Sequence, residues 1–250
     1  MSQTQGLHST KNMSLANIQK ELRSYADPVR AKNALWFFKT KKGQYGEGDI
    51  FIGVTGPTMR IIAKKYKDIE LSTVQQLLQS PIHEYRQLAL LILVYKYPKA
   101  DDVTRKRTCT LYLKSTKYIN NWDLVDISAP HVVGRYLLDK PKQRKILYTF
   151  ARSKNLWKKR IAIISTFTFI RNNDFKDTLN ISAILLHDTH DLIHKAVGWM
   201  LREIGNRDIQ TEEKFLKLHA THMPRTMLRY AIEKFDEKKR TSYLSMKYAR

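Results

Sequence analysis

Cysteine and acidic residues are scarce in this sequence, and long hydrophobic runs are missing from it. The 250 residues include a single cysteine, Cys109, which excludes an internal disulfide framework and a thiolate-based structural zinc site. The longest apolar run, from Leu88 to Tyr95, is too short to cross a bilayer. The first residues lack the charged-then-apolar pattern of a signal peptide. We therefore expect a soluble protein of a reducing compartment that does not associate with membranes.

Basic residues are the main excess of the chain. Lys and Arg number 45 against 23 Asp and Glu, a formal net charge of +22, and each successive block of 50 residues has four or five more basic than acidic residues. Because 42% of the residues are hydrophobic and 10% aromatic, the charge belongs to a folded chain and not to a disordered one. A folded surface that is positive throughout favours a long polyanion as partner, nucleic acid before an anionic membrane.

Helical signals dominate the pattern of apolar residues. Proline follows Asp27, Gly56 and Ser80, at positions where the first turn of a helix tolerates it. Apolar residues recur at helical spacing over residues 84–97, 157–170, 191–204 and 224–235. One short stretch, residues 49–54, has the character of a strand. The sequence thus predicts an all-α fold, with a flexible N-terminal tail over residues 1–13 and a single domain over residues 14–250.

A basic residue followed by small and apolar residues recurs along the chain. The four examples, which we call repeat anchors, are Arg86, Arg160, Lys195 and Arg229, at intervals of 74, 35 and 34 residues. Since 74 is twice 37, the spacing predicts a fifth anchor at position 123, which is Asp123, an acid among bases. Repeats of this length with two helices each are typical of HEAT-like or TPR-like solenoids, in which equivalent helices line one concave face. We expect that face to be basic.

Two further segments have the composition of ligand sites but not the spacing. The stretch from Gly43 to Gly56 holds five of the nine glycines and follows three lysines, yet it matches no nucleotide-binding fingerprint. It is interpreted as a connection, with a phosphate-contacting loop as the alternative. His187, His190 and His194 lie close together without an HExxH motif, so we predict no metal site and expect Asp188 to cap a helix.

Four residues have offsets that place them on equivalent helical faces of successive repeats. Relative to the anchors, Trp122 is at −1, Asp126 at +3, Arg160 at 0 and Trp199 at +4. Offsets of zero and three or four lie one turn apart on one face of a helix. Stacked repeats would bring Asp126, Arg160 and Trp199 to one wall. The alternative is that the tryptophans belong to the core, that Asp126 is a solvated helix residue and that Arg160 caps a helix or forms an ion pair.

Five blocks of this sequence resemble the DNA alkylation repair family, the AlkD-like 3-methyladenine DNA glycosylases. They are YGEGDIFIGV, NNWDLVDISAP, LWKKRIAIISTF, DLIHKAVGWMLREIG and MPRTMLRYAIEKF, and the similarity extends over roughly residues 30–245. The resemblance implies a HEAT-like repeat domain and an active site formed by Trp122, Asp126, Arg160 and Trp199. Thr55 follows GV where the family is expected to have a basic residue, so a DNA-backbone contact is not expected there.

The resemblance also implies a chemistry, namely excision of N3- or N7-alkylated purines from duplex DNA in base excision repair. In this hypothesis Asp126 stabilises positive charge on the sugar or positions the attacking water, and Trp122 and Trp199 face the cationic nucleotide. Arg160 would hold a phosphate near the lesion. The remaining candidates for DNA contacts are Lys158, Lys159, Lys195 and Arg229.

We expect a monofunctional enzyme that is monomeric, needs no metal or small-molecule cofactor, and acts in the cytoplasm, on the nucleoid if the source is bacterial. Two other functions fit the same composition. One is a non-catalytic HEAT-repeat protein that binds bent or branched DNA, and the other is a HEAT scaffold that binds an acidic protein. Retention of Trp122 and Asp126 argues against the first, and salt-dependent binding of duplex DNA would argue against the second.

Overall fold

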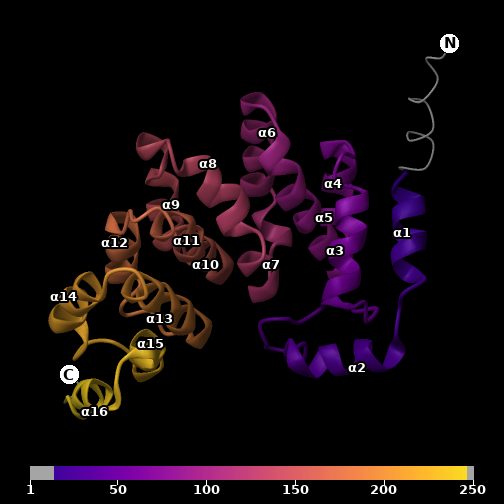
Figure 1. The fold of residues 1–250 in the computed structure, drawn as a ribbon. Coiled ribbons are helices and arrows are strands. Elements are labelled where there is room, and N and C mark those ends of the chain that lie inside the picture. Colours follow the sequence, from indigo (N-terminus) through magenta and orange to yellow (C-terminus); the bar gives the residue numbers. More distant parts are fainter. Residues whose placement is uncertain (1–13, 247–250) are drawn as a thin grey trace. The chain divides into compact units, whose positions relative to one another are not determined.

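The computed structural model describes residues 14–246, which fold mainly into helices (Figure 1). These residues form two compact units, with the boundary between Ser128 and Ala129. The predicted tail, residues 1–13, lies outside the described residues. Between residues 14 and 246, no helix combines the length and the apolar character needed to cross a bilayer.

Over residues 14–128, the first unit contains seven α-helices and two short 3-10 turns. The α-helices are α1 (Leu15–Arg23), α2 (Pro28–Phe37), α3 (Gly56–Lys65), α4 (Leu71–Leu78), α5 (His83–Lys96), α6 (Asp102–Lys114) and α7 (Trp122–Asp126). The 3-10 turns are Tyr97–Lys99 and Thr116–Tyr118.

The second unit begins with a π-helical turn, Pro130–Gly134, that runs into α8 (Arg135–Leu137). Its other α-helices are α9 (Lys145–Ala151), α10 (Leu156–Ser165), α11 (Phe167–Ile170), α12 (Lys176–Ile184), α13 (Asp191–Gly205), α14 (Ile209–His219), α15 (Arg225–Ala231) and α16 (Glu237–Ser245). Two 3-10 turns, Pro141–Gln143 and Ile232–Lys234, complete it.

Within each unit the helices pack in two layers. In the first unit α5 contacts α3, α4 and α7, while α4 contacts α1 and α6. In the second unit α13 contacts α10, α12, α14 and α15, while α9 contacts α10 and α12. The five predicted repeat anchors all lie in the layers formed by α5 and α7 and by α10, α13 and α15. The predicted all-α helical-repeat fold is therefore confirmed.

Side-chain caps set several of the helix starts that proline predicts. Asp27 accepts hydrogen bonds from the backbone N–H groups of Val29 and Arg30 at 2.9 and 3.0 Å, and Thr55 caps α3. The helix start predicted at Ser80 and Pro81 is placed slightly too early in the sequence. The Ser80 hydroxyl accepts the N–H of Ile82, and α5 begins only at His83. The predicted helix over residues 157–170 is likewise two helices, α10 and α11, separated at Thr166.

The predicted strand over residues 49–54 forms no strand, only one parallel bridge between Ile50 and Ile82. The segment is a connection between α2 and α3 that is bound to the start of α5. The buried Glu84 carboxylate accepts the N–H groups of Ile52 and Gly53 at 3.1 and 2.7 Å. Gly53 has a φ of +82°, and a Cβ there would lie 2.1 Å from the Asp27 carbonyl oxygen, so only glycine fits. The glycine-rich connection is thus a fixed part of the first unit.

Cys109 lies on α6 and is buried. Its neighbours Thr108 and Tyr112 are buried as well, and the Tyr112 hydroxyl lies 3.0 Å from that of Ser128. The only cysteine of the chain is therefore part of the core of the first unit.

Glu212 makes the stability of the second unit depend on pH. This residue is 1% exposed, and its carboxyl occupies the space left by the absent side chain of Gly205. Burial, with Glu213 nearby, raises the pKa of Glu212 to about 8, although Arg202 opposes the shift. The folded protein therefore holds a proton that the unfolded chain releases near the ordinary carboxyl pKa of about 4.3. Glu212 contributes fully to stability below that value, and its contribution is lost as pH rises to about 8.

Replacing Glu212 with Gln is expected to remove this pH dependence, because Gln has a similar shape and no charge. Urea unfolding of Glu212→Gln should therefore give a larger stability gain over wild type at pH 8 than at pH 4.5. Glu237→Gln, at an exposed position of the same unit, serves as the control. Equal gains for Glu212→Gln at both pH values would contradict the prediction.

Candidate active site

The short helix α7 carries two of the predicted site residues. Asn121 precedes it, and its side-chain oxygen accepts the N–H of Trp122 at 2.8 Å. Asp123, Leu124 and Val125 are buried, whereas Trp122 and Asp126 are half-buried. Since these two are four residues apart, they lie on one face of the helix, one turn from each other. The structure therefore brings Trp122 and Asp126 together at an accessible face of the first unit.

Aromatic side chains from the end of α2 surround Trp122. The rings of Phe38 and Trp122 are stacked with centroids 5.6 Å apart, and the ring of Phe37 meets Trp122 edge-on at 5.8 Å. Phe38 in turn stacks on Phe51 at 5.0 Å. These contacts fix the indole within an aromatic wall, with the geometries that ring quadrupoles favour.

A buried group of charged side chains lies directly behind this wall. His83 Nδ1 is 3.0 Å from Asp49 Oδ2, and His83 Nε2 is 2.8 Å from Asp123 Oδ2. Arg86 Nη2 donates to Asp49 Oδ1 at 2.6 Å, and Asn121 Nδ2 lies 3.3 Å from Asp49 Oδ2. Four charged groups thus form one connected network, which we call the His83 cluster: Asp49, His83, Arg86 and Asp123.

Charges within the His83 cluster shift the pKa values of His83 and Asp49. Burial lowers the pKa of His83, but the carboxylates of Asp123 and Asp49 raise it further, to a net value of about 9. Burial likewise raises the pKa of Asp49, and the hydrogen bond from His83 and the charge of Arg86 more than offset this, so the net shift is downward. Near neutral pH the cluster contains an imidazolium between two carboxylate side chains.

Two repeat anchors belong to this cluster and do not line an exposed basic face. Arg86 is buried because it bonds Asp49 and the carbonyl oxygens of Ser80 and Pro81. Asp123 is buried because it faces His83 and accepts a hydrogen bond from Gln87 Nε2 at 3.2 Å. In these two repeats the anchor side chain is buried, and a basic face lined by the repeat helices stays a prediction. The anchor instead ties its helix to neighbouring segments.

Arg160 and Trp199 lie on α10 and α13 of the second unit. Arg160 is 5% exposed, and its Nη1 donates to the carbonyl oxygen of Leu192, near the start of α13. Trp199 is half-buried; its indole N–H donates to Glu203 Oε1 at 3.0 Å, and its ring is tilted against Phe167 with centroids 5.8 Å apart. A shared wall formed by these two residues with Asp126 stays a prediction.

Gly198 explains how α13 presents Trp199. A Cβ at this position would lie 2.4 Å from the Met227 carbonyl oxygen and 2.5 Å from Tyr230 Cβ. Glycine therefore allows α13 and α15 to approach closely. This close packing fixes the rotation of α13 next to Trp199.

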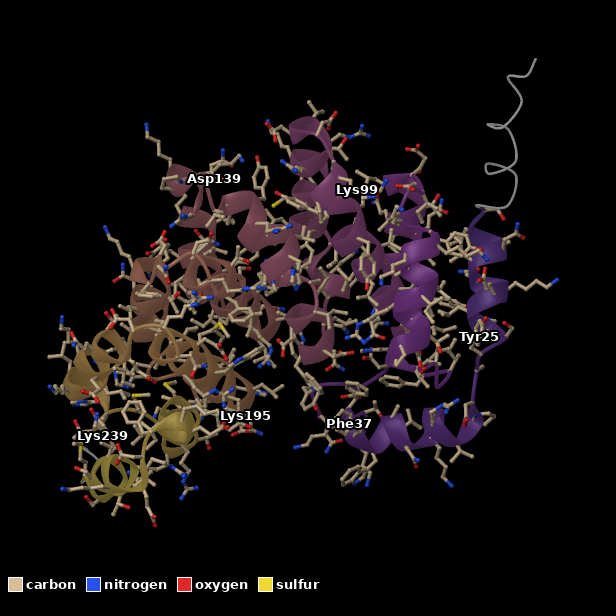
Figure 2. The ribbon with its side chains drawn as sticks, viewed as in Figure 1. Tyr25, Phe37, Lys99, Asp139, Lys195 and Lys239 are labelled. Atoms are coloured by element: carbon tan, nitrogen blue, oxygen red, sulfur yellow. The ribbon has the colours of Figure 1, made fainter. Side chains whose placement is uncertain are left out.

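Besides Arg160, the four lysines and arginines predicted to contact DNA differ in accessibility. Arg229 is exposed on α15, and the half-buried Lys158 holds its ammonium 5.6 Å from the Phe150 ring centroid. Lys195, labelled on α13 in Figure 2, forms an ion pair with Asp191 at 2.7 Å. Lys159 forms an ion pair with Asp188. Of these four residues, Arg229 and Lys158 form none of the ion pairs found over residues 14–246.

The histidine-rich segment before α13 has a structural role. His190, not Asp188, caps α13, with its Nδ1 accepting the N–H of Leu192 at 3.1 Å. The prediction of a cap at Asp188 is wrong because this carboxylate lies two residues farther back, where it accepts the N–H of His190 and binds Lys159. Over residues 14–246, no three His, Cys, Asp or Glu side chains are arranged to hold a metal ion.

The structure adds residues that sequence patterns did not single out. Phe37 and Phe38 contact Trp122, and Phe51, His83 and Asp49 lie behind Phe38. For Asp49 and Phe51 the available signal was their place in the block YGEGDIFIGV. Beside them, α2 has no buried residue, and Trp36 is 81% exposed near its end (Figure 2 labels the adjacent Phe37).

Comparisons with known proteins agree with this architecture. The protein family described as DNA alkylation repair enzyme matches residues 18–235. A solved structure titled as a predicted DNA alkylation repair enzyme from Enterococcus faecalis is similar with a TM-score of 0.66 and 15% identity, over 85% of this chain and 97% of that one. AlkD2 from Streptococcus mutans is similar with a TM-score of 0.53 and 16% identity, over 89% and 97%. A search of curated proteins gives no match.

Proposed function

Because this chain belongs to the DNA alkylation repair enzyme family, which matches it over residues 18–235, we propose that it is a monofunctional DNA glycosylase. Its proposed substrates are N3- and N7-alkylated purines in duplex DNA, and its product enters base excision repair. The protein is proposed to act as a monomer in the cytoplasm, without a metal or small-molecule cofactor.

One observation carries the proposal, the pairing of Trp122 and Asp126 on the accessible face of α7. An aromatic face and a carboxylate, one helical turn apart, suit a substrate that is a planar cation joined to a sugar. The ring attracts the cationic base, and the carboxylate attracts positive charge that develops on the sugar. A neutral base offers the ring no cation, and it leaves the sugar less readily.

The proposed reaction is hydrolysis of the N-glycosidic bond. The bond between C1′ and the alkylated base breaks, and its electron pair leaves with the base, which becomes neutral. Since the leaving base begins as a cation, no side chain has to protonate it. Asp126 stabilises the oxocarbenium-like sugar or positions the water whose oxygen bonds to C1′. The proton released by that water passes to solvent or to a carboxylate.

Binding of the DNA backbone is proposed for the second unit. Arg160 would hold a phosphate of the DNA backbone, and Lys158, Lys159, Lys195 and Arg229 would supply sequence-independent affinity. Support comes from the net charge of +22 and from the exposure of Arg229 on α15. Each phosphate that a cation neutralises adds to the salt dependence of binding.

Arg229→Ala is expected to weaken binding of duplex DNA and to reduce the slope of log Kd against log salt concentration by about one. The measurement is fluorescence anisotropy of a labelled duplex at several salt concentrations. Lys99→Ala, at an exposed position of the first unit that belongs to no predicted contact set, is the matched control. A larger loss of slope for Lys99→Ala than for Arg229→Ala would contradict the assignment.

The proposed function is tested by incubating the protein with methylated duplex DNA and measuring free 3-methyladenine and 7-methylguanine by chromatography. A duplex containing uracil is the neutral-base control. We expect release of both methylated purines and no release of uracil. Absence of methylated purines would overturn the enzyme assignment, and release of uracil at a similar rate would overturn the preference for cationic bases.

A further inference from the structure

Helix α7 is too short to hold its own conformation. It has five residues, and isolated helices of that length are unstable in water because nucleation is costly. The place of Trp122 and Asp126 therefore depends on what holds α7 within the first unit. Two contacts at α7 and its N-cap lead to neighbouring members of the His83 cluster: Asn121 Nδ2 donates to Asp49, and Asp123 Oδ2 lies 2.8 Å from His83 Nε2.

His83 joins these contacts into one clamp. Its two ring nitrogens face carboxylate oxygens, Asp49 Oδ2 at 3.0 Å and Asp123 Oδ2 at 2.8 Å. Ionised carboxylates only accept hydrogen bonds, so both nitrogens must carry a proton for both bonds to form. Because His83 is 2% exposed, water does not replace either bond. The clamp thus needs the charged form of the ring.

The surrounding charges favour that form. The charged groups that face His83 are Asp49 from the connection before α3 and Asp123 from α7, and Arg86 balances Asp49 from α5. Glu84, the remaining nearby acid of α5, is bound to the N–H groups of Ile52 and Gly53. Two cations and two anions therefore compensate each other, while a neutral His83 would leave a buried carboxylate facing an unprotonated nitrogen.

Ring contacts connect His83 to the indole as well. His83 stacks on Phe51 with centroids 4.6 Å apart and lies against Phe38 at 5.1 Å. Phe38 stacks on Trp122 at 5.6 Å. A change in the position of His83 is transmitted to α7 by two routes, through the hydrogen bond to Asp123 and through the ring of Phe38.

We infer that His83 is a positioning residue for the proposed reaction, holding α7 in place as a cation shared by Asp49 and Asp123 and so fixing where Trp122 and Asp126 meet the substrate. It contacts neither the base nor the sugar. The inference rests on the proposed function for the role of Trp122 and Asp126, while the clamp itself is a property of the first unit alone.

The clamp is tested by NMR on the full chain without DNA. The indole N–H signals of the four tryptophans are recorded from pH 6 to 10, and the Trp122 signal is identified by its loss in Trp122→Phe. We expect the Trp122 signal to move with a midpoint near pH 9, where the raised pKa of His83 places the loss of its proton. In His83→Gln the signal should start at a shifted position and show no such transition. His187→Gln, at an exposed histidine, should leave the transition unchanged.

Activity gives the second readout. His83→Gln is expected to lower kcat for release of 7-methylguanine by about tenfold or more, since a small misplacement of reacting groups is costly, while Kd for DNA changes less than about twofold. A Trp122 signal that is indifferent to pH near 9 in wild type would overturn the inference, whatever the variant does. This titration needs no variant at position 83, so it remains decisive if His83→Gln fails to fold. Absence of base release by wild type would overturn the proposed function and leave the NMR result standing.

Discussion

Asp126→Asn is expected to lower the rate of release of 3-methyladenine and 7-methylguanine by about 100-fold or more. Asn is close to Asp in shape, so α7 should keep its conformation while the negative charge on its accessible face is lost. Without that charge, the oxocarbenium-like sugar is no longer stabilised electrostatically. The measurement is single-turnover release of the two bases from methylated duplex DNA, with enzyme in excess.

Binding should respond in the opposite direction. Removing one negative charge from a site that faces phosphates does not weaken affinity for DNA, so Kd should stay the same or fall. Asp68→Asn, an exposed acid of the first unit, controls for the change in net charge and should release bases at the wild-type rate. Undiminished release by Asp126→Asn would exclude the proposed role of this carboxylate.

Arg86→Met is expected to reduce the free energy of unfolding by about 3–5 kcal/mol, the usual cost of leaving one partner of a buried ion pair behind. The guanidinium bonds the Asp49 carboxylate and two backbone carbonyl oxygens, and its removal leaves His83 as the one cation facing two buried carboxylates. Methionine occupies a similar volume, so the loss reflects the missing charge and donors. Urea unfolding followed by circular dichroism measures it.

Lys65→Met is the matched control, because Lys65 pairs with Glu21 at 2.7 Å on the surface. Solvent screens that pair, so its removal should cost far less than removal of Arg86. Adding Asp49→Asn to Arg86→Met should recover part of the loss, since the excess negative charge left in the His83 cluster is removed. A loss below about 1 kcal/mol for Arg86→Met would mean that the His83 cluster is not held together by its charges.

The repeat architecture was predictable from the sequence because helix pairs of nearly constant length place equivalent residues at regular intervals. Position 123 was predicted as an anchor from spacing alone, and Asp123 does lie on α7, in the layer of α5. The same reasoning could identify Trp122 and Asp126, because they share that short helix. What spacing could not show is the direction of each anchor side chain, which depends on whether a partner of opposite charge lies within reach.

The His83 cluster illustrates that limit. Asp49 lies in an irregular connection without periodicity, 34 residues before His83. Asp123 lies 40 residues after His83. Their contact is a product of tertiary packing, set by Gly53 and Glu84, and no local pattern encodes it. The acid that interrupts the basic anchors is explained by the same packing, because Asp123 is the counter-ion of a buried histidine.

Cys109 is the single cysteine of the sequence, and its thiol is buried. Cysteines introduced elsewhere can therefore be labelled selectively to follow the motions of the protein. A cysteine introduced at an exposed position would react with a maleimide dye or spin label while the native thiol stays shielded in the core of the first unit. Two such cysteines, one at Lys99 and one at Arg207, would report the distance between the two units in solution, with and without DNA. Site-specific labelling of the protein therefore does not require replacement of Cys109.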